Sequence, residues 1–227
     1  MANFYSRTKM NNKKPIRNFI HFILNKLNLD GWILLFVDSL LKQKGWFKAF
    51  RQKSSIDKSG NPLPWLTYSF IDFIKNRLDK EMNIFEFGSG NSTLFFSKKV
   101  KSVTAVEHNR KWFSMIKPKA PSNVKIIFRE LKIGGEYSNS INDENINYDI
   151  IIIDGEDREN CIYNSLKKLQ DNGVFILDDS ERKEYQQSIL LLMKNNFKKI
   201  DFWGMAPGVL FNKCTTLFYK TDNCIGI

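Results

Sequence analysis

The sequence predicts an open α/β sheet of seven strands with one antiparallel strand, preceded by a basic helical segment. Three observations lead to this prediction. An apolar run ends in a glycine turn at residues 83–93, and a second apolar run ends on an acid, Glu107, roughly 20 residues after Glu86. Four consecutive isoleucines stand at residues 150–153, a composition that only a strand buried on both faces requires.

The glycine turn is the most specific local pattern. An apolar strand is expected at residues 84–87, and Gly88 and Gly90 then let the backbone turn with no Cβ in the way of a ligand. Helical spacing continues over residues 92–100, so the segment predicts a nucleotide-binding strand, turn and helix. Thr93 stands where a dinucleotide fingerprint has its third glycine. A plain tight turn is the alternative interpretation.

The remaining strands are expected at residues 100–106, 123–128, 148–154, 173–178, 200–203 and 215–219. Helices are expected at residues 69–78 and 158–170. The last two strands form a hairpin, which makes one strand of the sheet antiparallel. Glu107 ends the second strand, where a carboxylate holds the hydroxyls of a ribose.

These motifs resemble those of the class I S-adenosylmethionine-dependent methyltransferases over about residues 64–220. The resemblance rests on Glu86-Phe-Gly-Ser-Gly-Asn-Ser-Thr93, the strand that ends at Glu107, and the segments 149–155 and 173–179. It implies a Rossmann-like sheet, S-adenosyl-L-methionine as the cofactor, and O-methylation of a small molecule or a surface-glycan sugar. Residues 64–68 and 154–158 look like a bacterial subgroup associated with surface-polysaccharide or small-molecule modification.

The resemblance also implies a set of site residues. The glycines approach the methionine part of the donor, Glu86 meets its amino end, and Glu107 takes the ribose hydroxyls. The expected cofactor-binding residues are Thr67, Tyr68, Glu86, Gly88, Ser89, Gly90, Ser92, Thr93, Glu107, His108, Arg129, Glu130 and Asp154. The expected catalytic residues are Asp154, Asp178 and Asp179, with Asp154 as the base or metal ligand. A helix N-cap is the alternative role for Glu107, Asp178 and Asp179. The resemblance also implies that the lead-in with Trp65 folds over the donor, with core packing as the alternative for Trp65.

A divalent metal such as Mg²⁺ is an open alternative for the three aspartates. Their pattern resembles the catechol and caffeoyl-CoA O-methyltransferases, which hold a divalent ion with an Asp and a later Asp-Asn pair. This chain has Asp178-Asp179 in place of Asp-Asn, and no lysine closely follows Asp154. We therefore favour a metal-free site.

Charge and apolar spacing set the amino-terminal part of the chain apart. Residues 1–60 hold +9 of the formal net charge of +11. We expect residues 1–63 to be a helical extension and linker, and residues 64–227 to be the methyltransferase domain. Apolar residues at 19–27 and 32–41 predict two amphipathic helices, which pack on the core, on a second copy in a homodimer, or on an anionic membrane surface. A solvated charged face is the alternative.

The sequence also bears on the location of the protein and on other classes of function. The three cysteines lack metal-like spacing, which favours reduced thiols in a cytoplasmic protein, with peripheral attachment to the inner membrane face as an alternative. An NAD-dependent oxidoreductase should have the third glycine and a substrate domain after the fifth strand. A non-catalytic donor-binding or assembly protein would not need the aspartates. Nucleic-acid and protein methyltransferases remain alternatives, although Asp154 is followed by Gly-Glu-Asp instead of a Pro-Pro-aromatic signature, so nucleic acid is a disfavoured partner.

Overall fold

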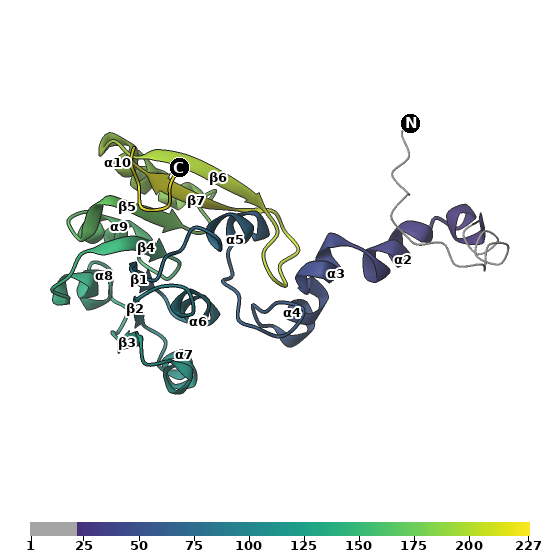
Figure 1. Ribbon diagram of the computed structural model, residues 1–227, viewed down its shortest axis with the longest axis horizontal. Helices are drawn as coiled ribbons and strands as arrows, with labels where there is room; N and C mark the ends of the chain where they lie inside the picture. Colours follow the sequence, from purple (N-terminus) through teal and green to yellow (C-terminus); the bar gives the residue numbers. More distant parts are fainter. Residues whose placement is uncertain (1–21) are drawn as a thin grey trace. The chain divides into compact units, whose positions relative to one another are not determined.

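The computed structural model describes residues 22–227, and the chain divides into two compact units between Lys44 and Gly45. The larger unit contains a seven-stranded sheet with the order β3-β2-β1-β4-β5-β7-β6 (Figure 1). Its strands are β1 Asn83–Phe87, β2 Ser102–Glu107, β3 Val124–Phe128, β4 Tyr148–Ile153, β5 Leu169–Leu177, β6 Lys198–Gly204 and β7 Lys213–Tyr219.

The topology confirms the predicted sheet. Strands β1 to β5 pair in parallel, whereas β7 runs antiparallel to both β5 and β6. The chain starts at β1, moves outward to β3, and returns to the other side of β1 with β4. Open α/β sheets bind ligands at such a switch point, in the crevice outside the carboxyl ends of the strands.

Helices cover both faces of the sheet. The helices of the larger unit are α4 Trp46–Gln52, α5 Tyr68–Ile74, α6 Asn91–Ser97, α7 Arg110–Ile116, α8 Glu136–Asn139, α9 Arg158–Ser165 and α10 Gln186–Lys194. Helices α8, α9 and α10 supply Tyr137, Cys161 and Ile189 to one hydrophobic cluster with alternate residues of β1, β4 and β5. Helix α5 contacts β6, and α6 contacts β2. The isoleucines of β4 are fully buried, as a strand covered on both faces requires.

Several element boundaries differ from the sequence prediction: the helix expected at residues 69–78 ends at Ile74, and the largest changes lie between α9 and β5. Helix α9 ends at Ser165 instead of residue 170, and β5 begins at Leu169 instead of residue 173. The reason is that Leu169 pairs with Tyr148 at the start of β4, before the register shifts toward the Ile150–Val174 pair. Leu169 is buried in the hydrophobic cluster, and this burial favours the longer strand.

The larger unit begins at Gly45, ahead of the boundary that the sequence suggested between residues 63 and 64. Helix α4 buries Trp46 and Ala49, and the Trp46 indole donates a hydrogen bond to the carbonyl of Val209 at 2.9 Å. Ile56 and Pro62 form an antiparallel bridge. Residues 45–63 therefore fold as part of the same unit as the sheet.

The smaller unit is helical within its described residues. Residues 22–26 are helical, followed by α2 Asp30–Val37 and α3 Leu40–Lys44. Helix α2 carries six consecutive apolar residues from Trp32 to Val37, so it is apolar around its whole circumference. The prediction of an amphipathic helix at this position was therefore wrong. Phe19 and Ile20, which contribute to the first expected helix, lie outside the described residues. No helix within residues 22–227 is long and apolar enough to cross a bilayer.

Candidate functional site

The glycine turn after β1 is built as the sequence pattern predicts. Gly88 has a φ of +99°, in the left-handed region that favours glycine. A Cβ on Gly88 would also lie 3.3 Å from the carbonyl oxygen of Asp154, which leaves little room for a side chain between the ends of β1 and β4. The backbone N–H of Gly90 donates to Thr93 Oγ1 at 2.9 Å, so the turn is tied to the first turn of α6.

Glu86 is a buried acid below this turn. Its side chain accepts a hydrogen bond of 2.6 Å from the hydroxyl of Thr93, and the residue is 1% exposed. Burial raises the pKa of Glu86 to about 7, against the opposing effect of hydrogen bonds from Ser92 and Thr93. Glu86 therefore titrates close to neutral pH and would be stabilised in its charged form by a cation in the site.

Glu107 joins the end of β2 to the same turn. Its Oε2 accepts from the backbone N–H and the hydroxyl of Ser89 at 3.2 and 2.9 Å, and its Oε1 accepts from the N–H of Asn109 at 2.8 Å. The indole of Trp112 in α7 donates to the Ser89 carbonyl at 2.6 Å. His108 packs edge-on against Tyr137, with ring centroids 5.5 Å apart. Carboxylate, indole and imidazole thus gather at the carboxyl end of β2.

Asp154 follows β4 and is held at the opening of the crevice. Arg158, in the first turn of α9, lies with its Nη2 3.8 Å from the Asp154 carboxylate. The same guanidinium donates to the Gly155 carbonyl at 2.7 Å and to the Asp178 carbonyl. Burial raises the pKa of Asp154, while the charges of Arg158 and Lys213 oppose the shift. Asp154 is therefore a carboxylate poised to accept a proton, with a fixed cation beside it.

Lys213, at the start of β7, is a buried cation among the other acids. Its Nζ contacts Asp178 Oδ2 and lies 2.6 Å from Asp179 Oδ1. Burial opposes the charged form of Lys213, but Asp178 and Asp179 outweigh it and raise its pKa. Asp178 also accepts from the Thr215 hydroxyl at 2.8 Å, and Asp179 also pairs with Arg182. The carboxylates of both aspartates are thus neutralised within the protein.

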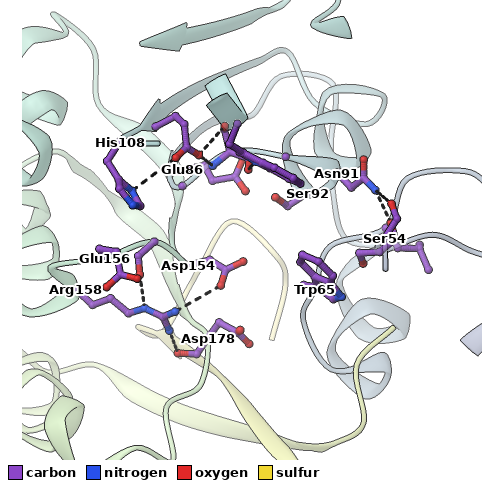
Figure 2. Close-up of a pocket in the computed structure, with 18 of the residues that line it drawn as sticks. Ser54, Trp65, Glu86, Asn91, Ser92, His108, Asp154, Glu156, Arg158 and Asp178 are labelled. Atoms are coloured by element: carbon purple, nitrogen blue, oxygen red, sulfur yellow. Dashed lines mark hydrogen bonds and ion pairs between the residues drawn. The ribbon is translucent and has the colours of Figure 1, made fainter. Parts of the chain in front are cut away.

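These side chains surround one cavity of about 370 Å³, within the range of small-ligand sites (Figure 2). Its acids are Glu86, Glu107, Asp154, Glu156 and Asp178, and its bases are Arg158 and Lys213. The cavity is thus acidic in a protein whose net charge is +11. Two lining atoms, Ser55 Oγ and His108 Nδ1, are buried and make no hydrogen bond within the described chain. His108 Nδ1 lies 3.6 Å from Glu107 Oε1.

The structure brings most of the expected site residues to this cavity. Those that line it are Glu86, Gly88, Ser89, Gly90, Ser92, Glu107, His108, Asp154 and Asp178. Thr93 and Asp179 lie behind the lining and contact Glu86 and Lys213. The Thr67 hydroxyl donates to the Phe202 carbonyl at 3.1 Å, and the N–H of Tyr68 donates to the Met205 carbonyl.

Arg129 and Glu130 line a second cavity, which opens beyond β3. Arg129 lies 3.1 Å from the Asp143 carboxylate, and Glu130 pairs with Arg110 at 3.8 Å. The backbone of Arg129 nevertheless lies beside the main site, because its N–H donates to the Glu107 carbonyl. Their side chains do not line the main cavity.

Several lining residues had no signal in the sequence that placed them in the site. Ser54, Ser55 and Leu63 come from the segment taken as a linker, Val209 comes from the loop between β6 and β7, and Lys213 is the first residue of β7. Asn91 ties the first of these segments to the turn, because its side-chain amide donates to Ser54 Oγ and the Ser55 carbonyl at 3.1 and 2.8 Å. Trp65, weighed as a cover for the donor or a core residue, lies across the cavity from Asp154 (Figure 2).

The aspartates do not fit a divalent metal site. Such an ion would need free carboxylate oxygens, whereas Lys213 Nζ already contacts both Asp178 and Asp179. Asp179 also has a φ of +48°, and its carboxylate lies behind the cavity lining. Within residues 22–227, no group of three or more His, Cys, Asp or Glu residues is arranged to hold a metal ion.

Comparison with known proteins gives the fold but no close relative. No family model matches the chain, and no curated protein matches it. Solved structures do match. The precorrin-6y C5,15-methyltransferase from Geobacter metallireducens has a TM-score of 0.54 and 14% identity, over 67% of this chain and 87% of that one.

Two further matches have different named substrates. An rRNA methylase from Streptococcus thermophilus has a TM-score of 0.51 and 17% identity, over 66% of this chain and 93% of its own. A protein assigned as a caffeoyl-CoA O-methyltransferase from Staphylococcus aureus has a TM-score of 0.54 and 14% identity, over 90% and 99%. The chain therefore has the class I methyltransferase fold, and at these identities the likeness is one of fold alone.

Proposed function

We propose that this protein is an S-adenosylmethionine-dependent methyltransferase that methylates a hydroxyl group of a small molecule or sugar. The observation that carries the proposal is the convergence of the Gly88–Gly90 turn, Glu107 and Asp154 on one acidic cavity. This cavity lies at the switch point of a methyltransferase fold. A cationic donor suits a cavity lined by five acids and two bases.

The donor end of the cavity is formed by β1, β2 and the turn between β1 and α6. Gly88 allows the donor to approach the backbone closely, and Glu107 is placed to accept hydrogen bonds from ribose hydroxyls. His108 and Trp112 offer flat side chains for a base, and His108 Nδ1 is a buried atom with an unfilled hydrogen bond. Glu86 provides a carboxylate for the donor's ammonium group.

The acceptor end is formed by Leu63, Trp65 and Val209 opposite Asp154. The Trp65 indole donates to the Pro207 carbonyl at 2.7 Å, so the ring is held in place while 41% of the residue remains exposed. A fixed, exposed indole can stack on an aromatic ring or on the apolar face of a sugar. This supports a small cyclic acceptor.

The donor supplies a methyl group that is already activated by the positive charge on its sulfur. The protein must therefore align the acceptor oxygen and remove its proton. Asp154 takes the proton, since its carboxylate faces the cavity and burial raises its pKa toward the value a base needs at neutral pH. Arg158 positions Asp154 and stabilises it while it is charged. No step requires a metal ion.

Calorimetry with the pure protein tests the donor site. S-adenosylmethionine and its demethylated product should bind, and NAD should not. Glu107→Ala should weaken donor binding by about 1.5 to 3 kcal/mol, the range for a hydrogen bond to a charged group. Glu130→Ala is the matched control, because Glu130 lies outside the cavity and pairs with Arg110 on the surface.

Unchanged donor affinity in Glu107→Ala would remove the ribose assignment, and binding of NAD in its place would favour an oxidoreductase. The acceptor is then sought by incubating labelled donor with a panel of sugars, phenols and RNA. Donor binding without transfer to any of the panel would favour a non-catalytic donor-binding protein. Transfer to RNA would replace the small-molecule acceptor with nucleic acid.

A further inference from the structure

The smaller unit exposes an unusual number of large apolar side chains for so short a segment. We refer to residues 22–44 as the apolar segment. Its exposed large hydrophobic residues are Phe22, Ile23, Leu27, Leu29, Trp32, Ile33, Phe36, Val37 and Leu40. Trp32 and Leu40 are 64% and 65% exposed. Exposed large apolar side chains gathered in one short segment mark an interaction site.

The length of the helices limits what this surface can contact. Helix α2 has eight residues, which at 1.5 Å per residue gives about 12 Å, far below the roughly 30 Å of a bilayer core. It is apolar around its circumference, and α3 has no buried residue. Helix α2 is therefore too short to cross a bilayer, but it can lie in the bilayer surface.

Charge decides between a bilayer and a second copy of the chain. Residues 1–60 hold +9 of the net charge, and Lys26 and Lys42 are exposed within the apolar segment itself. Residues 1–60 of two copies, each at +9, would repel each other on association, whereas anionic lipid headgroups attract basic residues near the surface. Trp32 is a residue that favours the boundary between headgroups and acyl chains.

We propose that the apolar segment docks on an anionic bilayer surface, inserting Trp32 and its apolar neighbours below the headgroups while the lysines contact the anionic lipids. The arrangement would hold the enzyme at a membrane face without a spanning helix. The proposal does not depend on the methyl donor or on the proposed reaction.

The full-length protein should be sedimented with vesicles of phosphatidylcholine mixed with phosphatidylglycerol, and with vesicles of phosphatidylcholine alone. Binding should be strong to the mixed vesicles at low salt, weak to the neutral ones, and reduced by added salt. Trp32→Ala should weaken partitioning roughly tenfold, because it removes a large inserted side chain. Trp203→Ala is the matched control, since Trp203 is 53% exposed on β6 of the larger unit.

A second pair of variants separates local charge from net charge. Lys26→Glu with Lys42→Glu should reduce binding, while Lys98→Glu with Lys101→Glu, which changes the net charge equally at exposed positions of the larger unit, should not. Circular dichroism checks helicity, because Lys42 also donates to the Val37 carbonyl at the end of α2. Equal losses in both pairs would overturn the proposal. Unchanged vesicle binding by Trp32→Ala would also overturn it. A protein that does not bind vesicles but forms a dimer, which Trp32→Ala breaks, would overturn it as well.

Discussion

Lys213 occupies the place that a divalent ion would need between Asp178 and Asp179. A buried carboxylate pair must be compensated by a cation, because burial disfavours its charged form. Here the compensation comes from the chain itself, since Lys213 Nζ contacts both carboxylates and also donates to the Trp65 carbonyl at 3.3 Å. Asp154 pairs with Arg158 and lines the cavity, which supports the role proposed for it as a proton acceptor.

This difference between the aspartates gives a prediction at the residue scale. A chelator should leave the rate of methyl transfer unchanged, and added magnesium should not raise it. Asp154→Asn should lower kcat by roughly 10²- to 10⁴-fold, the usual contribution of a general base, while donor affinity measured by calorimetry changes little.

Loss of activity with chelator, restored by magnesium, would contradict this prediction and return the aspartates to a metal-binding role. Glu184→Gln is a suitable control for Asp154→Asn. It removes one acidic charge from an exposed residue that pairs with Arg182 at 3.9 Å and lies outside the cavity.

At the scale of elements, the site depends on how closely the turns after β1 and β4 approach each other. The N–H of Asp154 donates to the Phe87 carbonyl at 3.1 Å. A Cβ placed on Gly155 would lie 2.0 Å from the Tyr137 hydroxyl and 3.0 Å from the backbone nitrogen of Gly88. Tyr137 itself is fully buried in α8, so it has little space to move away.

Gly155→Ala should therefore displace the turn that carries Asp154 and destabilise the fold by about 1 to 3 kcal/mol, as overpacking does. Adding Tyr137→Phe should recover part of the loss, because it removes the atom with the closest contact. Urea unfolding of the single and double variants measures the effect. If the double variant is less stable than the sum of the two single changes, the clash with Tyr137 is not the cause.

At the scale of the whole molecule, folding buries several carboxyl groups at the carboxyl edge of the sheet. Burial raises the pKa of Glu86 to about 7 and raises the pKa of Asp154 as well. Such acids bind more protons in the folded than in the unfolded state, so the ligand-free protein should lose stability as the pH rises.

The effect of Glu86 can be isolated. The stability that depends on proton binding by Glu86 is fully present below the unfolded pKa of 4.5, and it is lost as the pH rises through the folded pKa of about 7. The unfolding free energy should therefore fall less between these two pH values in Glu86→Gln than in the unmodified protein. The difference should be roughly 3 kcal/mol at most. Urea unfolding at both ends of this range is the measurement. An equally steep fall in Glu86→Gln would show that Glu86 is not the group that titrates.

The parallel sheet could be predicted because its signals are local. The isoleucines of β4, the turn at Gly88 and Gly90, and the acid at the end of β2 lie within single strands or their ends, and the topology confirms the sheet. The extent of β5 could not be predicted. The pairing of Leu169 with Tyr148 depends on neighbouring strands and not on the local apolar pattern.

Other residues that line the cavity could not be predicted for the same reason. Lys213 reaches Asp178 from a position 35 residues later in the chain, and Ser55 meets Asn91 from 36 residues earlier. Neither contact leaves a motif, because a lysine at the start of a strand and a serine in a polar segment are ordinary in sequence. The roles proposed for the expected donor residues stay predictions until binding is measured.

The wall opposite Asp154 also determines when the site can form during folding. The contacts of Trp46 with Val209, Trp65 with Pro207, and Lys213 with Trp65 join residues 163, 142 and 148 positions apart. Contacts of such sequence separation close late, because a long loop must be ordered first. On a ribosome, residues 45–65 would wait for nearly the whole domain to be synthesised. The proposed donor end depends on shorter separations, such as the pairing of Ile84 with Ile150 between β1 and β4, so its contacts can close before those of the opposite wall.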